Sequence, residues 1–476
     1  MQQGHPWQRS ATELARSIRS GEVSSREVVQ AHLDRMDAVN GSINAVTARF
    51  DEEALRCADA ADAAVQRGDV LGPLHGVPIT VKVNLDVVGQ ASDGGLPAMA
   101  EQMADEDCAV VRNLREAGAI VIARTNMPDL GMRWNTDNAL HGPTRNPWDP
   151  RRTPGGSSGG CAAAVAAGMS CLSIGNDYGG SIRLPAAYNG VASLRPTPGR
   201  LPSPVDPEDA DGLTVQLFYT DGPLARSVAD LELALSVMRR PDPGDPFWVD
   251  ASLGESGPCK VLVARGWLGL DLHPEVAAGL DAAAQHLEAA GYELVEAELP
   301  MLEEAVELWR DLGATEIDLF VPEDWMALGT EASRRWCQTS VSTSQVLDAA
   351  GYADAFARRA AVAAAWSRQF AKTPLILAPV DTQLAFMTEF DAEGDIEAAL
   401  AELRPRYAMN LAGSLLGLPT VTVPVSVGAS GMPQSVQLAS WRYQEQRVLT
   451  AGSAIEAKVA PITPLDLVAQ PGATDR

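Results

Sequence analysis

The stretch TPGGSSGGCAAAVAAG (residues 153–168) places two serines between two pairs of glycines and follows them with a run of small residues. Glycine loses more backbone freedom on folding than any other residue, so four glycines around two hydroxyls are costly to order. Such a cost is expected where the chain takes an unusual path, or where something comes very close to its backbone. Ser157 and Ser158 are therefore candidates for a functional site.

Two familiar interpretations of a glycine-rich serine loop do not fit its surroundings. Gly155-x-Ser157-x-Gly159 matches the G-x-S-x-G nucleophile elbow, but that elbow directly follows a strand. The residues directly before it, RNPWDPRRTP (145–154), belong to the turn-rich stretch 138–157, are rich in proline and cannot form a central strand. No P-loop or Rossmann pattern is present, which argues against a nucleotide site.

A second glycine–serine cluster follows, GNDYGGSIRLP (175–185). Gly179-Gly180-Ser181 stands after an apolar segment and opens what we expect to be a helix. Backbone N–H groups at such a point can hold an anion. A serine there has its hydroxyl beside ready-made donors for an oxyanion.

A serine nucleophile needs a base, and Lys82 is a candidate. It lies in the apolar segment PITVKVNL (78–85), where lysine is rarely buried. Burial lowers the pKa of a lysine because it disfavours the ammonium, and a neutral amine can take a proton from a hydroxyl. Considered alone, Lys82 fits a solvent-facing lysine on an edge strand better.

Lys82 is not alone, because these segments together resemble the amidase signature hydrolases. The matching segments are LHGVPITVKVN (74–84), ARTNMPDLGM (123–132), GPTRNPWDPRRTPGGSSGG (142–160), GNDYGGSIRLPAAYNGVASLRPTPGR (175–200) and LFYTDGPLARSVADL (217–231). Weaker matches, INAVTARF (43–50) and NLAGSLLGLPTVTVPV (410–425), extend the resemblance over nearly the whole chain.

The resemblance implies a Ser–cisSer–Lys triad that acts through an acyl-enzyme and needs no metal or cofactor. Lys82 matches the lysine, Ser157 the bridging serine at a cis peptide bond, and Ser181 the nucleophile. The other site residues that it implies are the oxyanion-hole N–H groups of Tyr178, Gly179, Gly180 and Ser181, the acyl-pocket position Gly131, and the supporting residues Ser158, Asp177 and Arg183.

The sequence also departs from the family pattern near these positions. Val83 and Asn84 follow the lysine, where the family commonly has an acidic residue soon after it. Asn176 and Tyr178 stand where many members have threonines. Two roles are open for Tyr178, which either narrows the acyl pocket or only packs beside it.

Strand and helix patterns alternate from end to end, which favours an α/β layered fold. We expect one large α/β/α domain over residues 1–476, with a mixed central sheet covered by helices. Its expected parts are N-terminal helices (10–67), the signature core (70–235) and a variable, mainly helical substrate-pocket region (about 300–372). Expected helices are 10–36, 51–67, 108–118, 160–167, 274–291 and 444–457, and expected strands are 74–89, 118–125, 169–175, 260–265, 292–299, 374–380 and 418–427. The S-x-x-E pattern of a capping box occurs at Ser10 and again at Ser24, and each predicts the start of a helical run.

Composition bounds the partners and the compartment. The chain has 37 Lys and Arg against 62 Asp and Glu, a net charge of −25, so nucleic acid and anionic membranes are unexpected partners. The six cysteines form no C-x-x-C pair and indicate neither a zinc site nor a disulfide framework. No apolar run approaches a membrane span, and we expect a cytoplasmic protein, with a homo-oligomer left open.

The family's breadth leaves the substrate open. We expect an amidohydrolase of a small, apolar or aryl amide or carbamate, with linear oligomers of the nylon type also open. This preference comes from candidate pocket residues in the variable region, namely Trp309, Phe320, Trp325, Met326 and Trp336. The alternative is the glutaminase subunit of a tRNA-dependent amidotransferase.

Overall fold

A single mixed β-sheet runs through the molecule. In a computed structural model, which describes residues 5–205, 211–321, 328–460 and 465, eleven strands of these residues pair into one sheet in the order β1-β3-β2-β4-β6-β5-β10-β11-β9-β7-β8. In that order the strands are Val46–Arg49, Ile120–Thr125, Pro78–Lys82, Leu172–Asp177, Thr220–Ala225, Ala192–Arg195, Thr420–Val427, Pro433–Ser440, Leu375–Pro379, Lys260–Val263 and Glu293–Val295.

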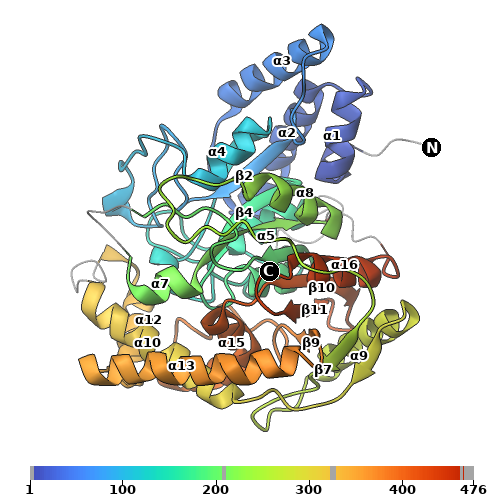
Figure 1. The fold of residues 1–476 in the computed structure, drawn as a ribbon. Coiled ribbons are helices and arrows are strands. Elements are labelled where there is room, and N and C mark those ends of the chain that lie inside the picture. The colour runs from blue at the N-terminus through green and yellow to red at the C-terminus, as the bar shows by residue number, and fades with distance from the viewer. Residues whose placement is uncertain (1–4, 206–210, 322–327, 461–464, 466–476) are drawn as a thin grey trace.

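The sheet joins two parallel sections through an antiparallel middle. Strands β3, β2 and β4 pair in parallel, and so do β9, β7 and β8. The strands between them, from β4 through β6, β5, β10 and β11 to β9, pair antiparallel. Figure 1 shows the helices gathered around this sheet, with α1–α3 at one end and α10, α12 and α13 at the other.

Both faces of the sheet are apolar, so alternate residues of one strand enter different cores. Val261 and Val263 of β7 lie in one hydrophobic cluster with residues of α1, α4, α8, α9 and α16. Leu262, between them, lies in the other cluster with residues of α10, α13, α14 and α15. The fold is thus a helix–sheet–helix sandwich, as predicted.

The helices vary from one to six turns. Their bounds are α1 Ala11–Arg19, α2 Ser25–Ile43, α3 Asp51–Arg67, α4 Ala109–Glu116, α5 Gly159–Ala166, α6 Arg183–Asn189, α7 Leu213–Phe218, α8 Val228–Met238, α9 Pro274–Ala289, α10 Leu302–Phe320, α12 Glu331–Ser342, α13 Ala349–Phe370, α14 Ile396–Arg406, α15 Ala408–Leu416 and α16 Glu445–Glu456.

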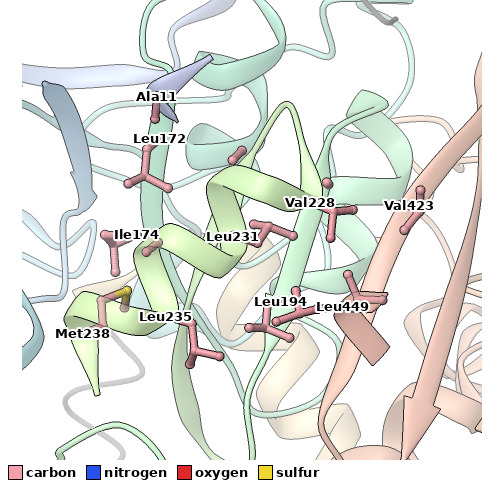
Figure 2. Close-up of a cluster of buried hydrophobic side chains, with 14 of the residues drawn as sticks. Ala11, Leu172, Ile174, Leu194, Val228, Leu231, Leu235, Met238, Val423 and Leu449 are labelled. Carbon is pink, nitrogen blue, oxygen red and sulfur yellow. The ribbon is translucent and has the colours of Figure 1, made fainter. Parts of the chain in front are cut away.

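Helix α8 illustrates how sequence fixes the packing. Ser227 caps its first turn by accepting a hydrogen bond from Asp230 N at 3.2 Å. Its apolar residues Val228, Leu231, Leu235 and Met238 recur at helical spacing and form one face. In Figure 2 this face lies over side chains from the sheet, including Leu172, Ile174 and Leu194.

Several predicted elements are confirmed within a residue or two. The helix predicted at 51–67 is α3, and the capping boxes at Ser10 and Ser24 begin α1 and α2 with both reciprocal hydrogen bonds present. The single helical stretch predicted at 10–36 is these two helices, because the chain turns between them at Gly21, which has a φ of 72°.

The strand predicted over 74–89 is wrong in length, since β2 spans only Pro78–Lys82. A turn ends it, in which Leu85 N donates to Lys82 O at 3.0 Å. The residues on either side are apolar because they pack in the core, which a β-branched pattern does not separate from strand pairing.

Other elements were absent from the prediction. Strand β1 lies inside the N-terminal segment expected to be helical, and its four residues are too short for a clear alternation. Strands β5, β6 and β11 and helices α8, α14 and α15 were also missed. Strand β6, TDGPLA, contains both glycine and proline, and so its sequence predicts a turn.

Candidate active site

The candidate site forms where two parallel strands end side by side. Lys82 is the last residue of β2 and Asp177 the last residue of β4, and these strands are neighbours in the sheet. Carboxyl ends of parallel strands meet at the same edge, where α/β proteins commonly build their sites. The double-serine loop precedes α5, and Ser181 stands between β4 and α6.

Lys82 contacts the first serine of the opening stretch directly. Its Nζ lies 2.6 Å from Ser157 Oγ and 2.6 Å from Asn176 Oδ1, and the side chain is fully buried. Asn176 Nδ2 in turn donates to Asn84 Oδ1 at 3.0 Å. The two asparagines thereby orient the amine toward the serine hydroxyl. The alternative of a solvent-facing lysine does not fit this burial.

Burial lowers the pKa of Lys82 to about 8, because the interior disfavours the ammonium. Cys161 in its thiolate form and the carboxylates of Asp177 and Asp221 oppose this shift by favouring the charged form. A sizeable fraction of Lys82 is therefore neutral near pH 8, where the amine can accept a proton.

The double-serine loop is glycine-rich because other backbone segments press against it. The Gly156–Ser157 peptide bond is cis, and Gly155 has a φ of 80°, in the left-handed region that favours glycine. A Cβ on Gly156 would lie 2.5 Å from Arg133 O, and one on Gly160 would lie 2.4 Å from Asn126 N. The glycines therefore serve both expected purposes. Gly155 allows an unusual backbone path, and Gly156 and Gly160 allow other segments to come close.

Ser158 links the double-serine loop to the second cluster. Its backbone N–H donates to Ser181 O at 3.1 Å, and its Oγ donates to Asn176 O at 3.2 Å. Ser158 thus holds the double-serine loop against β4 and against Ser181.

Ser181 lies in a turn held from inside by a carboxylate. Asp177 Oδ1 accepts from Gly180 N at 2.9 Å, and Oδ2 accepts from Ile182 N at 3.0 Å. The Gly180 N–H is therefore occupied. Within the described chain, the N–H groups of Tyr178, Gly179 and Ser181 have no acceptor. These groups can receive a developing negative charge on a substrate oxygen.

Asp177 is itself held by two buried arginines. Its carboxylate lies 2.8 Å from Arg183 Nη2 and 3.5 Å from Arg195 Nε, and all three side chains are inaccessible to solvent. Burial alone would raise the pKa of Asp177, but the two guanidiniums hold it well below the usual value. The turn therefore keeps its shape at any pH near neutrality.

A cavity of about 110 Å³ opens beside Ser181, and several aromatic rings contribute to its wall. Its lining includes Gly131, Trp134, Tyr178, Gly179, Ser181, Trp309 and Trp336. Trp309 Nε1 donates to Tyr178 O at 3.2 Å, and Trp134 Nε1 donates to Gly179 O at 3.1 Å, so both indoles brace the turn that carries Ser181. Tyr178, whose role was open, lines the cavity.

The predicted pocket residues divide. Trp309 and Trp336 line the cavity, whereas Phe320 is 64% exposed and does not. Trp325 and Met326 lie outside the described residues. Gly131 lies beside the double serine, because a Cβ there would be 3.5 Å from Ser157 Oγ.

Sequence reasoning missed three residues of the site. Asn84 and Asn176 were noted only as departures from the family pattern, although together they form the polar chain behind Lys82. Trp134 was not singled out. Its position just after the matching segment ARTNMPDLGM was the available signal, since that segment contains Gly131, which the resemblance assigns to the acyl pocket.

Among the residues that the structure describes, no cluster of three or more His, Cys, Asp or Glu side chains has the arrangement of a metal site. In the same residues, no helix has both the length and the apolarity to cross a membrane. All six cysteines are free thiols.

Known proteins of the amidase family are similar to this chain over most of its length. The family model described as Amidase matches residues 27–449. Indoleacetamide hydrolase of Bradyrhizobium diazoefficiens is 43% identical over 95% of this chain and 87% of its own length. A glutamyl-tRNA(Gln) amidotransferase subunit of Moorella thermoacetica is 32% identical over 94% of this chain and 96% of its own.

A solved structure, that of a 6-aminohexanoate cyclic dimer hydrolase, superposes with a TM-score of 0.82. The two chains are 29% identical, and the match covers 97% of this chain and 98% of the other.

Proposed function

The chain belongs to the amidase family and is a hydrolase of amide C–N bonds, and we propose that it cleaves a small aryl or otherwise apolar amide through an acyl-enzyme on Ser181. The observation that carries this proposal is the 2.6 Å contact between buried Lys82 and Ser157, beside a cavity that Ser181 lines. A base and a hydroxyl relay thereby lie in the protein interior, and the nucleophile that they would serve borders a substrate-sized space.

The first half of the proposed reaction forms the acyl-enzyme. Neutral Lys82 takes the proton of Ser157, and Ser157 takes the proton of Ser181 as the Ser181 oxygen attacks the carbonyl carbon. No hydrogen bond joins these two described serines in the free enzyme, so Ser181 Oγ rotates toward Ser157 as substrate binds. The negative charge on the carbonyl oxygen is held by the free N–H groups around Gly179.

The tetrahedral intermediate then collapses. The C–N bond breaks, and the proton held by the Ser157–Lys82 pair passes to the leaving nitrogen, so the amine departs neutral. An ester of Ser181 remains. Water attacks it with the same relay accepting its proton, and the carboxylic acid is released.

The aromatic cavity supports the choice of substrate. Its volume of about 110 Å³ is near that of engineered cavities of about 150 Å³ that hold benzene, so a single ring is the expected scale. The rings of Trp134 and Trp309 stack, with their centroids 6.2 Å apart. Indole rings in the cavity wall offer a planar surface to an aryl group. Carbamates of similar groups fit the same proposal, since their carbonyl is attacked in the same way.

Glutamine is the second candidate, supported by the similarity to the amidotransferase protein. Glutamine carries an ammonium, which needs an acidic or carbonyl-rich partner. No Asp or Glu is among the described residues that line the cavity. The lining therefore favours an aryl amide over glutamine.

A substrate panel tests the proposal. Phenylacetamide, indole-3-acetamide, an acetanilide, an aryl carbamate, a linear 6-aminohexanoate oligomer and glutamine are compared by kcat/KM, with released ammonia or amine measured. We expect the arylacetamides to rank first. Turnover of glutamine far above every aryl substrate would overturn the proposed substrate class without removing the amidase activity.

The compartment is a separate proposal. We infer a cytoplasmic enzyme, because its six cysteines are free thiols and three of them are buried.

A further inference from the structure

The cavity beside Ser181 is cationic in a strongly acidic protein. The charged residues in its lining are Arg133, Arg310 and Arg404, and no carboxylate of the described residues joins them there. The chain as a whole carries a net charge of −25. A basic cavity against that background is a specific feature and not a consequence of composition.

Two of the three arginines are neutralised by carboxylates behind the wall. Arg133 Nη2 lies 2.6 Å from Asp391 Oδ1, with both side chains inaccessible to solvent. Arg310 Nε lies 2.7 Å from Asp311 Oδ1. These guanidiniums are held by the protein itself.

Arg404 is different, because only neutral groups contact it. Its Nη1 donates to Thr343 Oγ1 at 3.3 Å and its Nη2 to Ser340 O at 3.4 Å, both long for charged donors. Within the described part of the chain it forms no ion pair. Burial and the nearby Arg310 lower its pKa to about 10, while Asp311, which pairs with Arg310, opposes this shift without contacting Arg404, so Arg404 stays protonated at neutral pH.

A half-buried guanidinium without an anion is costly, and binding of a carboxylate offsets that cost. The planar guanidinium also matches a carboxylate with two parallel hydrogen bonds. Ser340 and Ser344 line the same cavity; the Ser340 hydroxyl can add a donor, whereas the Ser344 hydroxyl donates to Ser340 O. Arg404 and Ser181 border one cavity, with the rings of Trp309 and Trp336 also in its lining.

We propose that the substrate of this enzyme is an amide whose aryl group carries a carboxylate, which Arg404 binds while Ser181 attacks the amide carbonyl. This inference rests on the proposed function, since it concerns the same cavity. It names a narrower class of substrate, in which the aryl ring binds beside Trp309 and Trp336 and its carboxylate binds Arg404. Substrates with an ammonium on the ring are excluded by repulsion from the same arginine.

The test compares two probes of nearly equal shape. 4-Carboxyphenylacetamide and 4-nitrophenylacetamide differ in charge but little in size. We expect kcat/KM of the wild-type enzyme to favour the carboxylate by about tenfold or more, the usual effect of a charged hydrogen bond. Arg404→Gln should bring the ratio of the two values close to one, and Arg404→Lys should retain part of it.

Arg368→Gln is the matched control. This substitution also removes one positive charge, but from an exposed position of α13 outside the cavity lining. It should leave the ratio of the two kcat/KM values as in the wild type. A ratio near one in the wild-type enzyme overturns the inference, as does a ratio that survives Arg404→Gln or collapses in Arg368→Gln.

A binding measurement separates this inference from the proposed function. Calorimetry on Ser181→Ala gives the dissociation constants of both probes without turnover. Tighter binding of the carboxylate that is lost in Ser181→Ala/Arg404→Gln supports the inference even if the active enzyme cleaves neither probe, which would count against the proposed function alone. Equal affinities, or no binding of the carboxylate, overturn the inference even if other aryl amides are cleaved.

Discussion

The two walls of the cavity are built in different ways. The signature wall, residues 153–183, is set by backbone: every residue from Thr153 to Asp177 is buried, and neighbouring chain segments contact its glycines. The helical wall, made of α10, α12 and α14, is set by side chains. In α12 only Ser333, Trp336 and Cys337 are buried. A backbone-built wall tolerates little change, whereas a side-chain-built wall can vary while the helices remain.

This difference suggests a division of labour. The proposed reacting groups lie on the signature wall and on the adjoining end of β2, and the groups that we propose select the substrate lie mostly on the helical wall. Substitutions in the first should change the rate for every substrate, and substitutions in the second should change the order of preference among substrates.

The largest effect should follow loss of the nucleophile or the base. Ser181→Ala and Lys82→Ala should each lower kcat by about 10⁴-fold or more, because groups that act as one unit fail together. The measurement is steady-state release of ammonia from an arylacetamide, with circular dichroism to show an intact fold. An active Lys82→Ala enzyme would exclude lysine as the base.

The next effect concerns pH. If neutral Lys82 is required, kcat/KM should fall about tenfold for each pH unit below about 8, the pKa that burial gives Lys82. Asn176→Asp places a carboxylate beside Nζ, stabilises the ammonium and should move this acidic limb up by roughly 1–3 pH units.

Asn176→Thr is the control for charge, since it removes the amide without adding a carboxylate. In this variant the acidic limb of the pH profile of kcat/KM should not move to higher pH. A profile that stays flat through the acidic side in the wild type, with the fold preserved, would argue against proton transfer to Lys82.

A smaller effect tests the backbone character of the signature wall. Gly156→Ala brings a Cβ to within 2.5 Å of Arg133 O, a backbone atom, and should lower the free energy of unfolding by about 1–3 kcal/mol or more. Gly41→Ala in α2 meets no atom within 4 Å and should be neutral or slightly stabilising. Urea denaturation compares the two, and equal stabilities would show that the wall can relax.

The smallest effect tests the helical wall. Trp309→Phe removes cavity-lining surface and the hydrogen bond to Tyr178 O, and should lower kcat/KM for aryl amides by about tenfold while changing that for small aliphatic amides less. Trp366→Phe, in the core and fully buried, should cost stability and leave this preference unaltered. Equal losses for aryl and aliphatic substrates in Trp309→Phe would assign Trp309 to the support of catalysis.

Sequence prediction succeeded where local pattern decides the structure. Capping boxes at Ser10 and Ser24 begin helices because cap and helix lie within four residues. The α/β layering followed from alternation of strand and helix patterns. The contact between Lys82 and Ser157 joins residues 75 positions apart, and it was expected from the resemblance and not from any local pattern.

Prediction failed where distant pairing decides. Asn176 reaches Lys82 because β2 and β4 pair with Thr80 opposite Ser173, a register that no local pattern reveals. Phe320 is exposed although it lies in an amphipathic helix, since the sequence does not show which turn of α10 runs past the core. What the residue pattern alone predicts correctly depends on contacts within a few residues of the chain, and what it misses depends on contacts between distant segments.

The path of the chain through the sheet has an evolutionary consequence. Residues 296–374 connect β8 to β9, and both strands pair with β7, so this connection can be exchanged without altering any strand register. Trp309, Trp336 and Ser340 all lie in it. We therefore expect that exchange of this one contiguous gene segment alters the substrate preference, while the proposed reacting residues Lys82, Ser157 and Ser181 are inherited unchanged.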